Sequence, residues 1–87
     1  MIKPKSIYDP LYNSFIKRLV QERKRLNLSQ VEVADRLQMT QSDVSKIENN
    51  ERRLDILELK NLLAIYQLNE NIELKKALKN FFDLDIK

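Results

Sequence analysis

Apolar residues recur at intervals of three and four positions along most of the chain, which is the spacing of helices that bury one face. The pattern predicts an all-α domain of five helices, at residues of about 10–26, 30–37, 41–49, 56–67 and 72–82. A chain of 87 residues leaves no room for a second domain of ordinary size. We therefore expect a single domain over residues 10–87, preceded by a flexible arm at residues 1–9.

Residues that cap helices mark where four of these helices begin. Asp9 followed by Pro10 is a start signal, because Asp accepts hydrogen bonds from the first free amides and Pro suits the first helical position. Three capping boxes follow, in which the capping residue stands three positions before an acidic one. They are Ser29 with Glu32, Thr40 with Asp43, and Asp55 with Glu58.

The short helix expected at 41–49 presents a polar face outward. Val44 and Ile47 are its only large apolar residues, so they fix the side that points to the core. Because a helix advances by about 100° per residue, a set of amide, hydroxyl and ammonium groups points the other way or stands at the helix entrance. These groups can read base edges in the major groove of DNA. We expect base contacts from Gln41, Ser42, Ser45, Lys46 and Asn49.

The stretches LSQVEVADRL and MTQSDVSKIENNERRLD resemble the helix-turn-helix of the phage-repressor and Cro-like family, also called the xenobiotic-response-element type. The resemblance extends from about Phe15 to Leu68. It implies a compact five-helix, lambda-repressor-like DNA-binding domain whose second and third helices form the motif. It also implies a regulator of transcription, most simply a repressor, that binds double-stranded DNA in the cytoplasm of a bacterium or a phage-infected cell.

The resemblance assigns further roles to polar residues around the motif. The family pairs an arginine at the place of Arg23 with a glutamate at the place of Glu48, so we expect a partly buried ion pair there. Phosphate contacts are expected from polar and basic residues at the helix entrances and in the loop after residue 49, because arginine forks suit phosphate oxygens. These are Gln30, Thr40, Arg52 and Arg53, the last with hydrogen bonds to carbonyls of its own fold as the alternative.

Composition excludes several classes of function. The chain has no cysteine and no histidine, which argues against a thiolate metal site and against imidazole chemistry. We expect no cofactor, no metal, no enzymatic activity, and neither a signal peptide nor a membrane span. Residues 1–53 carry 11 Lys and Arg against 7 Asp and Glu, whereas residues 54–87 carry 5 against 6. The excess positive charge lies on the half with the motif, either to face phosphate or merely to keep the protein soluble.

Glycine is absent from the chain, although three of its turns would suit that residue. Asn27 and Asn50 stand where the first and third helices end, and Asn accepts the left-handed backbone of a helix C-terminus well. Gln38 stands at the turn inside the motif and accepts it less readily, so the sequence leaves the geometry of that turn open.

The C-terminal part of the chain carries more apolar residues than one helix face can bury. Eight large apolar side chains fall between positions 56 and 68. Because exposed apolar patches often mark interfaces, we expect a homodimer through the helix at 56–67, the helix at 72–82 or the C-terminal tail. The alternative is that the helix at 72–82 folds back and completes the core. The alternative function is a protein-interaction module or an antitoxin, which binds a toxin or another protein partner.

Overall fold

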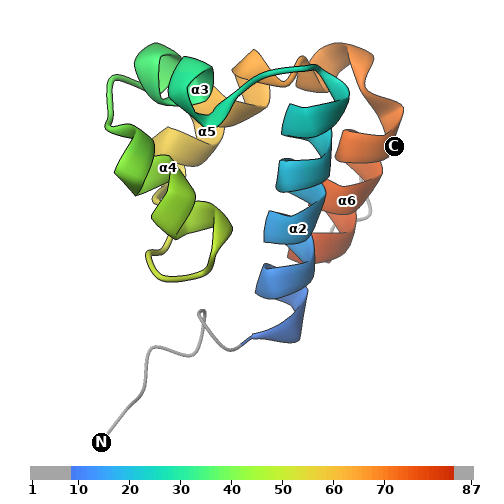
Figure 1. Cartoon of the computed structure of the whole chain (residues 1–87). Coiled ribbons are helices and arrows are strands. Elements are labelled where there is room, and N and C mark those ends of the chain that lie inside the picture. The colour runs from blue at the N-terminus through green and yellow to red at the C-terminus, as the bar shows by residue number, and fades with distance from the viewer. Residues whose placement is uncertain (1–8, 84–87) are drawn as a thin grey trace, which may run out of the picture.

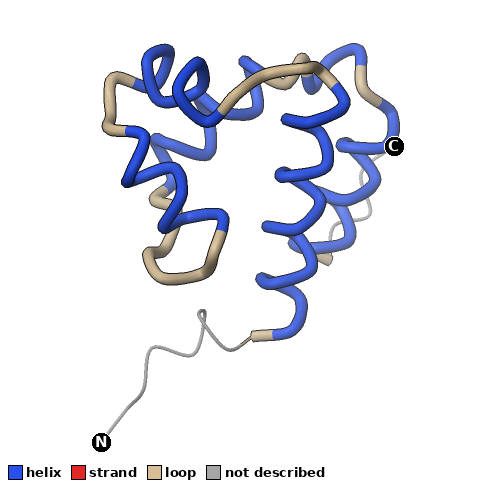
Figure 2. Tube along the Cα trace, viewed as in Figure 1, coloured by secondary structure: helices blue, strands red, loops and turns tan. Residues whose placement is uncertain are grey.

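Five α-helices and one 3₁₀ turn account for the secondary structure of residues 9–83, the part of the chain that the computed structural model describes (Figure 1, Figure 2). Residues 1–8 of the arm predicted at 1–9, and the tail at 84–87, lie outside the described residues. Helix α5 ends two residues before its expected limit, because Gln67 turns into the left-handed region at φ 60°. The elements are α2 (Pro10–Arg25), α3 (Gln30–Leu37), α4 (Gln41–Glu48), α5 (Ile56–Ile65), η1 (Leu68–Glu70) and α6 (Ile72–Phe82).

Side-chain caps begin all five α-helices. Asp9 Oδ1 accepts hydrogen bonds from the amides of Leu11 and Tyr12, at 2.8 and 3.3 Å. The three capping boxes before α3, α4 and α5 are closed in both directions. In the first, the bond from the Ser29 amide holds the pKa of the Glu32 carboxyl below its usual value. These local contacts satisfy amides that have no partner within the helix.

The turns of the motif form without glycine. Gln38 adopts the left-handed conformation at φ 58° and ψ 45°, and its amide donates back to the carbonyls of Ala34 and Asp35. Asn27 and Asn50 are also left-handed, as their positions after helices suggested. The turn of this helix-turn-helix motif therefore places a glutamine in the left-handed conformation, which glycine would adopt without steric cost.

The core lies where the helices converge, and Val44 and Ile47 point into it with exposures of 4% and 5%. Helix α6 runs beside α2 (Figure 1), and the Phe81 ring stacks on the Phe15 ring with centroids 4.9 Å apart. The C-terminal helix thus folds back and completes the core, which was the alternative to an interface role. The core residues are Tyr12, Phe15, Ile16, Leu19, Val33, Ala34, Val44, Ile47, Leu62, Tyr66 and Leu74.

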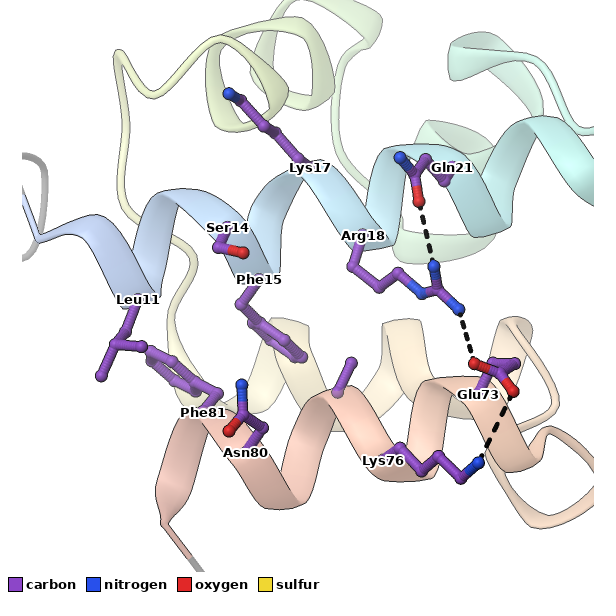
Figure 3. Close-up of a pocket in the computed structure, with 11 residues that line it drawn as sticks. Leu11, Ser14, Phe15, Lys17, Arg18, Gln21, Glu73, Lys76, Asn80 and Phe81 are labelled. Atoms are coloured by element: carbon purple, nitrogen blue, oxygen red, sulfur yellow. Dashed lines mark hydrogen bonds and ion pairs between the residues drawn. The ribbon is translucent and has the colours of Figure 1, made fainter.

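Polar contacts along the same seam hold α6 in place. Figure 3 shows Arg18 of α2 reaching Glu73 of α6, with 3.2 Å between guanidinium nitrogen and carboxylate oxygen. Deeper in the seam, Glu22 is 3% exposed and accepts hydrogen bonds from Asn71 Nδ2 at 2.6 Å and from Arg25 Nε at 2.9 Å. Asn71 in turn caps α6 by accepting from the Leu74 amide. This buried pair was not predicted from the sequence, although Glu22 follows Leu19 by three positions on the inward stripe of α2.

The stability of the protein is expected to depend on pH partly through Glu22. Burial alone would raise the pKa of its carboxyl, but the hydrogen bonds from Asn71 and Arg25 outweigh burial and lower it below 4.5. A carboxyl with a lowered pKa in the folded state stabilises the protein above its unfolded pKa, and this contribution is lost as the pH falls through the folded value. We expect Glu22→Gln to lower the urea midpoint at neutral pH and to flatten its decline towards about pH 3.

Urea unfolding of the wild type, Glu22→Gln and Glu51→Gln at several pH values checks this expectation. Glu51 is exposed, so its variant serves as a control and should follow the wild type. A Glu22→Gln midpoint that falls with pH as steeply as that of the wild type would contradict the assignment.

Candidate nucleic-acid interface

Helices α3 and α4 pack against each other on either side of the turn at Gln38 (Figure 1). The fixed inward positions of Val44 and Ile47 turn the opposite face of α4 to solvent. On that face Gln41, Ser42, Lys46 and Asn49 are exposed and Ser45 is half-buried. The structure therefore gathers the five residues that sequence analysis selected as base readers on one side of one helix, with Asn49 as the residue that ends it.

A chain of hydrogen bonds connects this face to α2 through two glutamines. Gln41 Nε2 donates to Gln30 Oε1 at 2.7 Å, and Gln30 Nε2 donates to Glu48 Oε1 at 2.9 Å. Each glutamine amide has two N–H donors, of which the bond named here uses one. Gln41 therefore keeps one N–H and its carbonyl oxygen for a ligand while its orientation is fixed by Gln30. The sequence predicts separate DNA contacts for Gln30 and Gln41, and the bond between these two side chains is a finding of the structure.

This series of hydrogen bonds ends in the ion pair between Arg23 and Glu48, the two residues that the family resemblance paired. Arg23 Nε lies 2.7 Å from Glu48 Oε2, and Arg23 Nη2 lies 2.9 Å from Glu48 Oε1. Their side chains are only 10% and 12% exposed. Arg23 Nη1 also donates to the carbonyl of Leu28, which fixes the connector before α3. The bond to Glu48 raises the pKa of Arg23, so the guanidinium stays charged.

The loop between α4 and α5 gives Arg52 a partner within the fold. The sequence predicts a phosphate contact for this side chain, and in the structure its guanidinium also makes two hydrogen bonds to the Glu58 carboxylate, at 2.9 and 2.7 Å. These bonds hold the pKa of the Glu58 carboxyl below its usual value. Arg52 also donates to a backbone carbonyl, that of Arg53, at 3.2 Å, whereas the Arg53 side chain bonds to no carbonyl among residues 9–83. Arg52 therefore first serves to attach the loop to the first turn of α5.

The remaining phosphate candidates lie at the edges of the same surface. Arg53 is exposed and has no ion pair within the described part of the chain. Thr40 is exposed, and its hydroxyl accepts from the Asp43 amide at 3.1 Å, which leaves the hydroxyl proton for an acceptor outside the protein. Gln30 is half-buried and retains one N–H. The surface thus combines amides and hydroxyls with the exposed cationic side chains of Lys46 and Arg53 around the outward face of α4.

Two short helices around a tight turn, the second of which exposes a polar face, define the helix-turn-helix class of DNA-binding proteins. The sequence model of a protein family, the Helix-turn-helix family of the Cro/C1 or XRE type, matches residues 19–71, more than half of the chain. The chain belongs to this family, and it is a DNA-binding regulator of transcription. No curated protein sequence matches it. The family is generally non-enzymatic, and within residues 9–83 no helix is long and apolar enough to cross a membrane.

Proposed function

We propose that the protein is a cytoplasmic repressor that reads a palindromic operator as a homodimer, with α4 in the major groove. One observation carries the proposal: the outward side of α4 is polar, and its leading residue, Gln41, is held in place by Gln30 and Glu48. A side chain that is already oriented loses less conformational entropy when it binds. A palindrome suits a dimer, because two recognition helices about 34 Å apart meet two half-sites on one side of the duplex.

In this proposal the residues of α4 divide the reading of bases among themselves. Gln41 contacts adenine at two points: its free N–H donates to adenine N7, and its carbonyl oxygen accepts from the adenine N6 amino group. Lys46 is exposed and donates to guanine, whose N7 and O6 are both acceptors. The shorter groups of Ser42, Ser45 and Asn49 contact bases or the adjacent phosphates. Asn49 Nδ2 donates to Ser45 Oγ at 3.4 Å, so these two side chains are adjacent on the outward face of α4.

Phosphate contacts position the protein and do not select sequence. We assign them to Gln30, Thr40 and Arg53, and to Arg52 only through the N–H groups that Glu58 leaves free. The N-terminus of α4 adds its partial positive charge next to these groups. Arg53 is the strongest of them, since its guanidinium is exposed and no carboxylate among the described residues is paired with it.

Arg53→Ala is expected to weaken binding to cognate and scrambled DNA to a similar extent. Loss of one phosphate contact should also reduce the slope of log K against log salt concentration by about 0.9. Titrations of both duplexes at four salt concentrations measure the two effects together. Lys75→Ala is the matched control, because Lys75 is an exposed cation on α6. A slope that stays the same in Arg53→Ala would remove Arg53 from the phosphate contacts.

A mobility shift assay tests the proposal as a whole. With a duplex selected from random sequence, the complex should survive a large excess of scrambled competitor DNA, because base contacts add to the phosphate contacts only on the selected site. A complex that both DNAs displace equally would contradict sequence-specific binding.

A second candidate function, binding to a protein partner as an antitoxin does, is favoured by one observation. Ile56 and Leu57, in the first turn of α5, are 84% and 60% exposed. Exposed apolar side chains next to each other are typical of interfaces. Ile56 and Leu57 belong to α5, whereas the proposed base readers belong to α4, so one protein can combine the two functions.

A further inference from the structure

The peptide unit between Arg53 and Leu54 is held at both of its ends by side chains. The Leu54 N–H donates to Tyr12 Oη at 3.1 Å, which joins the loop after α4 to the first turn of α2 (Figure 1). The Arg53 carbonyl of the same unit accepts from Arg52 Nη1 at 3.2 Å. Because a peptide unit is planar, bonds to its N–H and to its C=O together fix the orientation of the whole plane.

Each of these two side chains is itself held by a further helix. The Tyr12 ring is buried, and its centroid lies 6.3 Å from that of the Phe81 ring of α6 at a tilt of 58°, which fixes the place of the hydroxyl. Arg52 is held by its two hydrogen bonds to Glu58, in the first turn of α5. The peptide unit is therefore anchored to α2 through its N–H and to α5 through its C=O.

Other contacts fix the rest of the loop but not this peptide plane. The amides of Glu51 and Arg52 donate to the Lys46 carbonyl at 2.8 and 3.3 Å, and the Leu54 side chain packs against the core. Arg53 lies between these contacts with an exposed side chain. The direction in which that side chain leaves the backbone depends on the peptide plane that follows its Cα atom.

We propose that Tyr12 and the Arg52–Glu58 pair are positioning residues, which hold the Arg53–Leu54 peptide so that the Arg53 guanidinium meets a DNA phosphate. We call these three side chains the peptide clamp. The inference rests on the phosphate contact proposed above for Arg53 and names the residues on which that contact depends. A guanidinium whose backbone is already oriented loses less conformational entropy when it binds.

Titrations of cognate and scrambled duplexes at four salt concentrations test the role of Tyr12. Tyr12→Phe keeps the ring and removes the bond to Leu54. It should weaken binding to both duplexes alike and lower the slope of log K against log salt concentration by up to about 0.9, as Arg53→Ala does. Combined with Arg53→Ala it should cause no further loss, because two changes that act through one contact are not additive.

Tyr66→Phe is the matched control, since it also removes the hydroxyl of a buried tyrosine, and its salt slope should match that of the wild type. A wild-type slope in Tyr12→Phe, or a further loss in the double variant, would overturn the positioning role of Tyr12. If Arg53→Ala lowers the slope and Tyr12→Phe does not, the phosphate contact stands and the peptide clamp alone is refuted.

The Glu58 side of the peptide clamp is tested by a comparison of two neutral variants. Glu58→Gln and Glu51→Gln each remove one negative charge, but only the first loosens Arg52. Glu58→Gln should therefore bind both duplexes at least about threefold more weakly than Glu51→Gln. Equal or tighter binding by Glu58→Gln would show that Arg52 does not position Arg53.

Hydrogen exchange, measured by NMR without DNA, separates the peptide clamp from the proposed function. Tyr12→Phe should accelerate exchange of the Leu54 amide at least about tenfold, whereas Tyr66→Phe should leave it unchanged. Unchanged exchange in Tyr12→Phe would overturn the proposal whatever the DNA titrations give. Accelerated exchange in a protein that ignores every duplex would refute the proposed function, and with it the phosphate role of Arg53.

Discussion

Glu48→Ala is expected to lower the free energy of unfolding by about 3–5 kcal/mol, the usual cost of leaving one charge of a buried pair unmatched. Arg23 would keep its charge in a site where its side chain is only 10% exposed, with the Leu28 carbonyl as its remaining partner. The Gln30 side-chain amide would lose its acceptor as well, so Gln30 would no longer fix the orientation of Gln41. The variant should therefore also bind DNA more weakly at temperatures at which it is still folded.

Urea unfolding measures the first effect, and Glu51→Ala provides the control three positions further along the chain, in the loop after α4. Glu51 is exposed, and its replacement should change the unfolding free energy by less than about 0.5 kcal/mol. Replacing both partners, as Arg23→Met with Glu48→Leu, should recover much of the stability, because no charge is left unmatched. A Glu48→Ala protein as stable as the control would show that the pair is not needed to join α2 to α4.

Lys46→Ala is expected to weaken binding to the cognate site by about 1–3 kcal/mol and to relax the choice of base at one position of each half-site. Lys46 is the one cation on the exposed face of α4, and it is one turn beyond Ser42. Its ammonium group can donate to both acceptors of a guanine in the major groove.

Competition titrations with every single-base variant of the site separate this role from a simple loss of charge. Lys75→Ala, which removes a cation from α6, should leave the base preferences unchanged. Affinity that falls equally for cognate and scrambled DNA in Lys46→Ala would make Lys46 a phosphate contact and contradict its assignment to base reading.

The helices and the outward face of α4 could be predicted because they depend on nearby residues. A capping box involves residues three positions apart, and the direction of a side chain on α4 follows from Val44 and Ile47 alone. The ion pair of Arg23 and Glu48 joins residues 25 positions apart, and it was accessible only through the family resemblance. Capping and helical periodicity, which involve residues close in sequence, therefore predict the helices and the exposed residues of α4.

The partners of polar side chains could not be predicted in the same way, because they depend on how the helices pack. Asn71 bonds to Glu22 across 49 positions, and that contact exists only once α6 lies beside α2. Arg52 is only six positions from Glu58, yet its contact with Glu58 could not be predicted. An arginine in a loop has the same sequence pattern whether it contacts phosphate or attaches the loop to the next helix. The backbone conformation of Gln38 could not be predicted for a different reason. The packing of α3 against α4 sets its left-handed conformation and outweighs the preference of glutamine for a right-handed backbone.

Selection of binding sites from random duplex DNA tests whether α4 reads bases as part of a symmetric dimer, since it reports sequence, symmetry and spacing in one measurement. We expect an enriched palindrome with half-site centres about 34 Å apart, and an adenine that loses its enrichment when the selection is repeated with Gln41→Ala. Random sequences that emerge without enrichment, or an enriched site that Gln41→Ala selects unchanged, would contradict this expectation.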